Sequence, residues 1–177
     1  MRFITASVLG ALVACGDQQQ EGAASGSTPY VIRDADRRAM EDSVQAYLRR
    51  SVKATEALDS AGMLADYAAT GRIVSVQPDG RVITNHDSLA RTLSDGLREG
   101  LKDVRFKMRP AHVAVLSPRA AAFTAAFHVT TTRPNGMTGT FPGVVTGVVE
   151  VLDNRTQVRL EHNSVYMDQG RWETKTK

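Results

Sequence analysis

The sequence predicts a single α+β domain in which helices cover one face of an antiparallel sheet. Between residues 34 and 100 the apolar residues recur mostly at helical spacing, whereas beyond Lys102 they alternate with polar residues, as in half-buried strands. The chain has 177 residues, enough for one ordinary domain and too few for two of typical size. Helices that come first and strands that follow are the order of an α+β fold.

Two helices begin the domain. The first is expected over 34–58, where Asp34 and Asp36 suit the positive end of a helix dipole. The second is expected over 60–69, and Gly71 ends it. The apolar positions of these helices are Met40, Val44, Tyr47, Leu48, Val52, Leu58, Met63, Leu64 and Tyr67.

A short hairpin and a third helix come next. Residues 73–76 and 81–84 are typical of strands, and Pro78-Asp79-Gly80 between them favours a turn, because Pro fixes one φ and Gly adopts a positive one. The third helix should begin near residue 87 and run towards Gly100, since its leucines lie four residues apart.

The rest of the chain is predicted to form the sheet. Pro110 has no amide proton for a strand ladder and therefore marks a bend. Asn135-Gly136 and Asp153-Asn154 predict hairpin turns. The expected strands are 104–109, 113–116, 123–132, 144–152 and 158–166, of which 144–152 is apolar on both faces, as in a covered central strand.

The first fifteen residues resemble the signal of a bacterial lipoprotein. Arg2 precedes about a dozen mostly apolar residues, fewer than the ~20 that a membrane-spanning helix needs. Leu12-Val13-Ala14-Cys15 then resembles a lipobox. This resemblance implies cleavage before Cys15, acylation of Cys15, and a lipid anchor in the bacterial cell envelope, on the periplasmic face of the outer membrane in a Gram-negative cell. The alternative is a buried cysteine in an ordinary first strand or helix.

The predicted organisation has three parts. Residues 1–14 are the lipoprotein signal peptide, 15–29 a lipidated flexible tether, and 30–177 the folded domain. The tether is rich in Gln, Gly and Ser and shows no apolar periodicity, and a flexible chain of this length spans roughly 20 Å.

Three stretches of the domain, 57–67, 78–80 and 160–164, resemble the helix junction, first hairpin and terminal strand of the nuclear transport factor 2-like superfamily, in particular its SnoaL-like branch. The resemblance covers residues 34–166. It implies a cone-shaped fold in which a curved antiparallel sheet carries three helices on its concave face. Because this fold serves enzymes, carriers and inert modules alike, it does not decide the function.

The ketosteroid isomerases of this superfamily provide a test for catalysis. Their mechanism combines an Asp base with a Tyr and a protonated Asp in an apolar cone. Here the base position falls at about Gln77, the tyrosine position at about Ser51, and the neutral acid within 146–149, where no carboxyl occurs. None of the three positions matches, so the leading hypothesis is a membrane-tethered, non-catalytic small-molecule-binding or interaction module.

Several side chains are candidates for the wall of a ligand cavity. Strand parity places His162 on the same face as Val158 and Leu160, which should turn it inward, and a neutral His offers one donor and one acceptor. The alternatives are a core His satisfied by a backbone partner and tyrosines that pack with their hydroxyls at the rim. The candidate cavity-lining residues are Tyr47, Met63, Tyr67, His162, Ser164 and Tyr166.

The second hypothesis is an enzyme of isomerase or cyclase type with a non-standard site around His162 and Asp66. Either side chain can act as a base when it lies within reach of the substrate. For Asp66 the alternative is a solvated carboxylate on the surface of the second helix.

Composition argues against other classes of function. Aromatic residues make up 6% of the chain and the net charge is +3, with scattered basic residues, which disfavours nucleic-acid binding. The four histidines lack ligand spacing and no phosphate-binding loop occurs, so no metal or cofactor is expected. The expected partners are the membrane, a small apolar ligand, and a second copy bound through the outer sheet face around Thr124, His128, Thr130 and Thr132.

Overall fold

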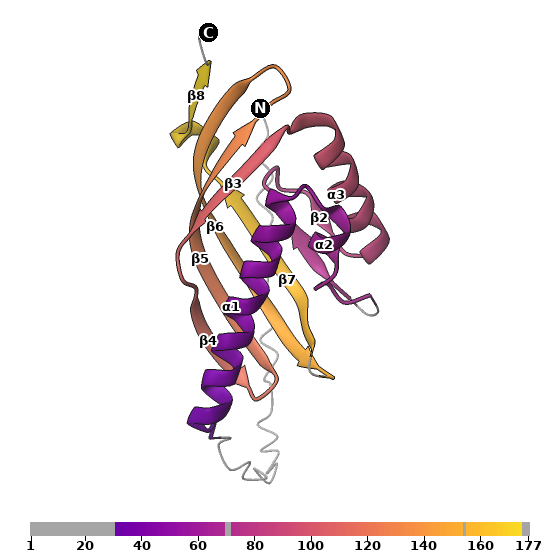
Figure 1. Cartoon of the computed structure of the whole chain (residues 1–177). Helices are drawn as coiled ribbons and strands as arrows, with labels where there is room; N and C mark the ends of the chain where they lie inside the picture. The colour runs from indigo at the N-terminus through magenta and orange to yellow at the C-terminus, as the bar shows by residue number, and fades with distance from the viewer. Residues whose placement is uncertain (1–30, 70–71, 154, 175–177) are drawn as a thin grey trace, which may run out of the picture. The chain divides into compact units, whose positions relative to one another are not determined.

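The first helix, α1 (Asp34–Glu56), lies across one face of a large sheet (Figure 1). Its buried residues, Met40, Val44, Tyr47 and Leu48, lie three, four or one position apart and therefore share one face of the helix. The helix ends two residues before the predicted end, because Leu58 adopts a left-handed φ of 54° and the Asp59 amide donates to the Ala54 carbonyl at 2.9 Å.

The structure, a computed structural model, describes residues 31–69, 72–153 and 155–174. The predicted signal peptide 1–14, the lipidation site Cys15 and the tether 15–29 lie outside the described residues. The described residues from Ile32 onward belong to one compact unit.

The second helix, α2 (Ser60–Leu64), is shorter than predicted. Asp59 caps it by accepting a hydrogen bond from the Gly62 amide at 2.9 Å. Beyond α2 the chain leaves the helical path because it pairs with the sheet: the Val158 amide donates to the Asp66 carbonyl at 2.8 Å, and Tyr67 forms a parallel bridge with Val158.

The predicted hairpin and third helix follow. Strands β1 (Val74–Val76) and β2 (Val82–Ile83) pair antiparallel, and helix α3 (His86–Gly100) begins after Asn85, whose side chain accepts from the Ser88 amide. Ile73, Ile83 and Leu89 are buried together in a small core of their own.

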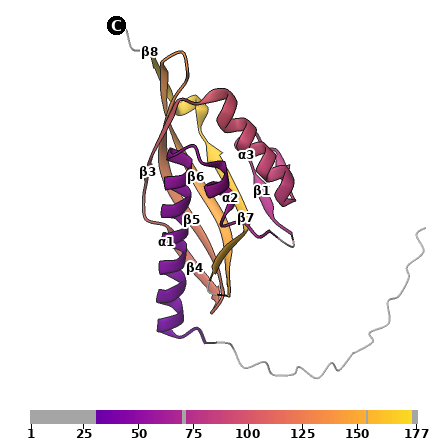
Figure 2. The same ribbon diagram turned by 45° about the vertical axis from the view of Figure 1, so that its right-hand side comes forward.

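The remaining strands form most of the sheet, and Figure 2 shows the helices on one side of it. The strand order is β2-β1-β7-β6-β5-β3, with β4 also paired to β5 and β8 to β6. The sheet is mixed rather than antiparallel throughout, because β1 pairs with β7 in parallel. The bounds are β3 (Asp103–Met108), β4 (His112–Ser117), β5 (Ala120–Thr132), β6 (Met137–Leu152), β7 (Arg155–Val165) and β8 (Arg171–Thr174), with a 3-10 turn η1 (Met167–Gln169) before β8.

Strand β7 contains a bulge. Val149 of β6 pairs with Val158, whereas the preceding residue, Val148, pairs with Leu160. Arg159 is therefore one extra residue in β7, and such a bulge shifts the side-chain alternation by one position.

The bulge decides which residues of β7 face the helices. Val158 is buried before it, and Glu161 is buried after it, although three positions separate them. Leu160 and His162, which lie between and beyond them, are exposed. The second half of β7 therefore presents Glu161 and Asn163 to the concave side of the sheet.

Two glycines of β6 bring that concave face close to aromatic rings. A Cβ on Gly143 would lie 2.4 Å from the Phe127 ring, and one on Gly147 would lie 2.7 Å from the Phe123 ring. Because each Phe pairs directly with its glycine across the β5–β6 ladder, the rings lie over the strand instead of standing away from it.

Candidate functional site

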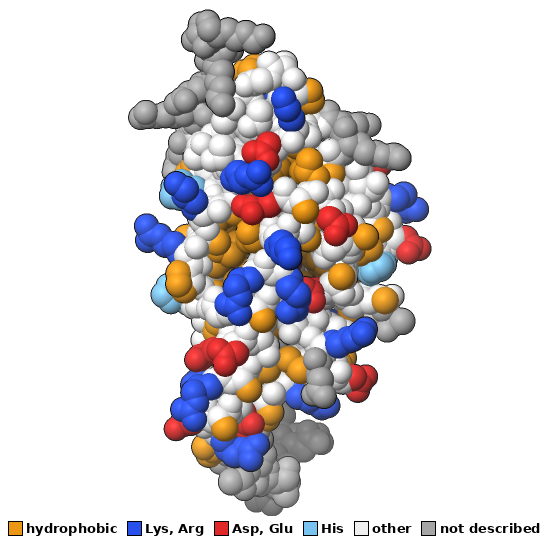
Figure 3. Space-filling view, viewed as in Figure 1, with side chains coloured by type: hydrophobic (Ala, Val, Ile, Leu, Met, Phe, Trp, Pro, Cys, Tyr) orange, Lys and Arg blue, Asp and Glu red, His pale blue; other side chains and the backbone are white. Residues whose placement is uncertain are grey.

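A cavity of about 860 Å³ lies between the concave face of the sheet and the helices. Most of its wall is aliphatic or aromatic, as with Leu48 of α1, Leu93 of α3 and Phe127 of β5. Figure 3 shows hydrophobic side chains exposed among charged ones on the face that carries the helices. The volume lies in the range of roughly 300–1,000 Å³ that is typical of small-molecule sites.

Glu161 of β7 is the one carboxylate among the described residues that line this cavity. It is only 7% exposed, although a carboxylate is normally found in water. The Cα of Glu161 pairs with that of Ser75 in β1, so the carboxylate sits where the parallel ladder joins the short hairpin to the main sheet.

Three neutral donors hold the Glu161 carboxylate. The Tyr47 hydroxyl, from α1, donates to Oε2. The Tyr67 hydroxyl and the Asn163 side-chain amide donate to Oε1 at 2.8 Å and 2.7 Å. All four residues line the cavity, so a hydrogen-bonded cluster forms part of its largely apolar wall.

Both tyrosines stay protonated at neutral pH. Burial, and then the nearby negative charge of Glu161, raises the pKa of Tyr47 well above its usual value of 10.0. The same two causes raise the pKa of Tyr67, and a hydrogen bond with Ser75 acts in the opposite direction. The two hydroxyls therefore act as donors to the carboxylate rather than as sources of negative charge.

The polar cluster continues along β1. Ser75 is 1% exposed and accepts a hydrogen bond from the Gln77 side-chain amide at 2.7 Å. Ser75 in turn interacts with the Tyr67 hydroxyl. One polar strip thus runs from Gln77 to Glu161 along the cavity wall.

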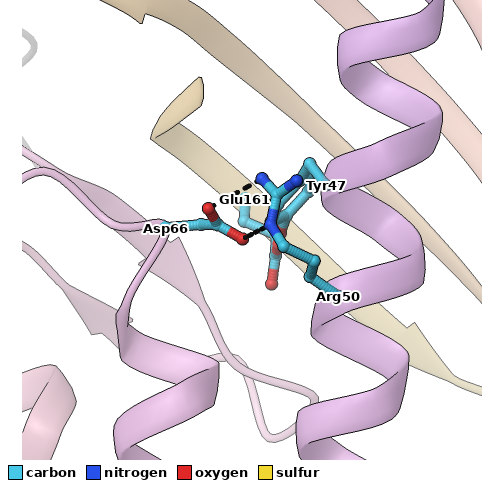
Figure 4. Close-up of polar contacts among 4 residues, drawn as sticks. All are labelled: Tyr47, Arg50, Asp66 and Glu161. Carbon is cyan, nitrogen blue, oxygen red and sulfur yellow. Dashed lines mark hydrogen bonds and ion pairs between the residues drawn. The ribbon is translucent and has the colours of Figure 1, made fainter. Parts of the chain in front are cut away.

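A second acidic group near α1 has a different environment. Asp66 forms a bidentate ion pair with Arg50 of α1, in which Nη2–Oδ1 is 2.8 Å and Nε–Oδ2 is 3.1 Å (Figure 4). The hydrogen bond with Asp66 is the main cause that raises the pKa of Arg50. The Arg50 side chain is 51% exposed, and neither residue lines the cavity. Asp66, a predicted catalytic candidate, is thus tied to a cation outside the cavity.

The predicted cavity residues fall into two groups. Tyr47, Met63 and Tyr67 line the cavity. His162, Ser164 and Tyr166 do not line it: His162 and Tyr166 are exposed, and His162 and Ser164 contact each other at 3.1 Å.

The expectation that His162 and Ser164 face inward is therefore corrected. Strand parity from Val158 placed them on the concave side, and the extra residue Arg159 moves them to the other face. The same shift turns Glu161 towards the concave face and the cavity. No feature of the local sequence signals the bulge.

The positions singled out by the isomerase resemblance also occur in the cavity wall. Gln77 and Ser51 both line it, and neither carries a carboxyl or phenol. The strand segment 146–149 has no acid, but Gly147 within it pairs with Glu161 on the neighbouring strand. A carboxyl is thus present near the expected acid position, whereas the base position holds an amide.

Within the described residues, no three His, Cys, Asp or Glu side chains come close enough together to hold a metal ion. Among those same residues, no helix combines the length and apolar character needed to cross a bilayer.

Comparison with solved structures finds the same fold in proteins of distant sequence. A protein from Novosphingobium aromaticivorans, provisionally assigned as a scytalone dehydratase, aligns with a TM-score of 0.70 at 9% identity over 78% of this chain and 91% of its own. A type 2 hexachlorocyclohexane dehydrochlorinase aligns with a TM-score of 0.70 at 8% identity over 81% and 95%. A nuclear transport factor 2-like superfamily protein from Salmonella enterica gives 0.67 at 15% identity over 73% and 92%.

A search of curated proteins finds no match to the sequence. Residues 44–168, more than half of the chain, match the family model described as the SnoaL-like domain. These residues include strands β1 to β7, most of α1 and the Glu161 cluster, whereas β8 lies beyond the matched range. The structure, an open, curved, mixed sheet with helices on one face, agrees with this sequence match. The chain belongs to the SnoaL-like family and has a nuclear transport factor 2-like fold.

Proposed function

We propose that this domain binds a small, largely apolar molecule and holds the polar end of that molecule at Glu161. The observation that carries the proposal is a buried carboxylate with three oriented donors in the wall of a large apolar cavity. A carboxylate accepts about four hydrogen bonds. The described residues supply three of them, which leaves one acceptor position for a donor on the ligand.

The hydrogen bonding favours binding over catalysis. Tyr47 and Tyr67 both donate their protons to Glu161, so neither hydroxyl has a proton left to stabilise an oxyanion. The position expected for a general base holds Gln77, which cannot accept a proton from carbon. A fixed acceptor in an apolar cavity is the arrangement that orients a bound small molecule.

Filling the cavity tests this proposal. Ser51 lines the cavity from α1, so Ser51→Trp should occupy part of it, whereas Ala39→Trp adds the same side chain on an exposed part of the same helix. In native mass spectrometry of the purified full chain, we expect a retained small molecule in the wild type and in Ala39→Trp, and its loss in Ser51→Trp. A molecule retained equally by all three proteins would contradict binding in this cavity.

A second candidate function is acid–base catalysis, and the observation that favours it is the location of Glu161 beside Gly147. In this case Glu161, rather than Asp66 or His162, is the group that exchanges a proton. Turnover of a ketone or alcohol retained by the protein, abolished in Glu161→Gln, would support the enzyme and overturn the non-catalytic function.

We also propose that a lipid anchor at Cys15 tethers the domain to the cell envelope; the support is the sequence of residues 1–15. The thiol is the acyl acceptor, so Cys15→Ser should leave the precursor uncleaved and remove it from the detergent phase on phase partitioning. A Cys15→Ser protein of mature mass in the detergent phase would contradict the anchor.

The homodimer through the outer sheet face stays a prediction. Analytical ultracentrifugation of the full chain with Thr130→Arg on that face checks it. We expect the dimer to dissociate, since each subunit would bury an unpaired charge at the interface, and an unchanged dimer would exclude this face.

A further inference from the structure

We propose that the polar end of the ligand is a protonated amine, so that the cavity selects an organic cation over a neutral alcohol of the same shape. This inference rests on the proposed function and adds the chemical class of the ligand. It depends on the balance of charge around Glu161.

Within the part of the chain that the structure describes, no cationic side chain forms an ion pair with Glu161. The ion pairs found within the described residues involve Asp36, Asp66, Asp79, Asp103 and Glu150, but not Glu161. The donors to Glu161 are two phenols and an amide, which orient the carboxylate and bring no positive charge to it.

The nearby charged groups do not change this balance. Arg50 lies on α1 one turn beyond Tyr47, and its guanidinium is bound in bidentate fashion to Asp66, so this pair is neutral as a unit. Arg133, the other charged residue in the cavity lining, is exposed in the turn between β5 and β6. Ser75 and Asn163, which pack beside Glu161, are neutral.

An ammonium group complements this site better than a hydroxyl does. It neutralises the buried charge where the local dielectric is low, and a hydrogen bond between two charged groups is about twice as strong as a neutral one. It also carries three N–H donors, whereas a hydroxyl carries one. The carboxylate accepts one of the three, and the oxygen of Tyr47, which donates its proton to Oε2, can accept another.

The experiment compares three probes that share one apolar ring system: naphthylmethylamine, naphthylmethanol and naphthoate. Their affinities for the full-length chain are measured by equilibrium dialysis at neutral pH. We expect the amine to bind at least about tenfold more tightly than the alcohol, and naphthoate to bind weakest, because it places a second negative charge near Glu161. This comparison uses the wild-type protein and depends on no variant.

Two variants locate the effect. Glu161→Gln should lower the affinity for the amine to that for the alcohol, whereas Glu41→Gln removes the same charge from a residue of α1 outside the cavity and should leave the preference unchanged. Near-UV circular dichroism shows that each variant is folded.

The outcomes separate this inference from the proposed function. If the amine and the alcohol bind equally and Ser51→Trp blocks both, the cavity binds small molecules and the selection of amines is wrong. If Glu41→Gln abolishes the preference as Glu161→Gln does, the amine is attracted by general surface charge and the inference is overturned. If no probe binds, both proposals fail.

Discussion

Two carboxylates near helix α1, those of Asp66 and Glu161, have different hydrogen-bond partners. Asp66 makes two hydrogen bonds with the guanidinium of Arg50, whose side chain is 51% exposed, so water screens the pair on the arginine side. Glu161 is almost fully buried and receives hydrogen bonds from neutral groups only, among the described residues. The two acids thus differ in what balances their charge.

This difference separates a structural acid from a functional one. The Asp66–Arg50 pair joins α1 to the segment after α2 and leaves no net charge to act on a ligand. The Glu161 cluster costs desolvation energy that its neutral donors only partly offset. A buried charge that is oriented but not neutralised is therefore the better indicator of a binding site.

The largest effect is expected from removing the Glu161 carboxylate. Glu161→Leu removes the acceptor of the buried Tyr47 hydroxyl and of two partly buried donors, the Tyr67 hydroxyl and the Asn163 amide. A buried group left without its partner costs about 1–3 kcal/mol. We expect the free energy of unfolding to fall by about 3 kcal/mol or more, as measured by urea denaturation. A fall below about 1 kcal/mol would show that the cluster is not the buried network described here.

A smaller loss of stability is expected when one of the donors to Glu161 is removed. Tyr47→Phe keeps the ring and removes the hydrogen bond to a charged acceptor, which is worth about 1.5–3 kcal/mol. Tyr166→Phe is the matched control, because Tyr166 is exposed and lies outside the cavity. Equal stabilities of the two variants in urea would contradict the role of Tyr47.

High pH should act through the same tyrosines. Their pKa is raised in the folded state, so the folded protein holds protons that the unfolded chain loses above about pH 10. Their contribution to stability is complete below pH 10 and is lost as the pH rises towards the folded-state pKa, with a slope of about 1.4 kcal/mol per pH unit for each tyrosine.

Urea denaturation between pH 9 and pH 11 checks this sign. The wild type should lose stability above pH 10 more steeply than the double variant Tyr47→Phe, Tyr67→Phe. Parallel curves for the two proteins would mean that neither hydroxyl is perturbed by burial.

The smallest effect is expected at the Asp66–Arg50 pair. Asp66→Asn breaks an ion pair whose arginine is half exposed, so the free energy of unfolding should change by less than about 1 kcal/mol and ligand retention should be unchanged. If Asp66→Asn abolished retention while Glu161→Gln did not, the assignment of structural and functional acids would have to be reversed.

The contrast also explains which parts of the site the sequence could predict. Helical spacing is a local property of the sequence, and it predicts Tyr47 in the cavity because Tyr47 lies on the apolar face of α1. The sequence does not predict Glu161 in the cavity, because the orientation of its side chain depends on the pairing between β6 and β7, where Arg159 forms the bulge. Residues 144–152 are apolar on both faces, so they contain no alternation that would have revealed the shift in their partner strand.

The fold, like the site, could be predicted from the sequence only where it depends on local patterns. The three helices and the order of the long strands could be predicted from periodicity. The parallel pairing of β1 with β7 and the addition of β8 to β6 could not, because both join segments far apart in the sequence.

The most direct test is a crystal structure of the full-length chain with naphthylmethylamine bound. The account predicts that the naphthyl ring lies in the cavity, near Leu48 and Phe127, and that the ammonium nitrogen lies within about 3 Å of a Glu161 carboxylate oxygen. A probe bound on the outer sheet face, or in the cavity with its nitrogen turned to solvent and away from Glu161, would contradict it.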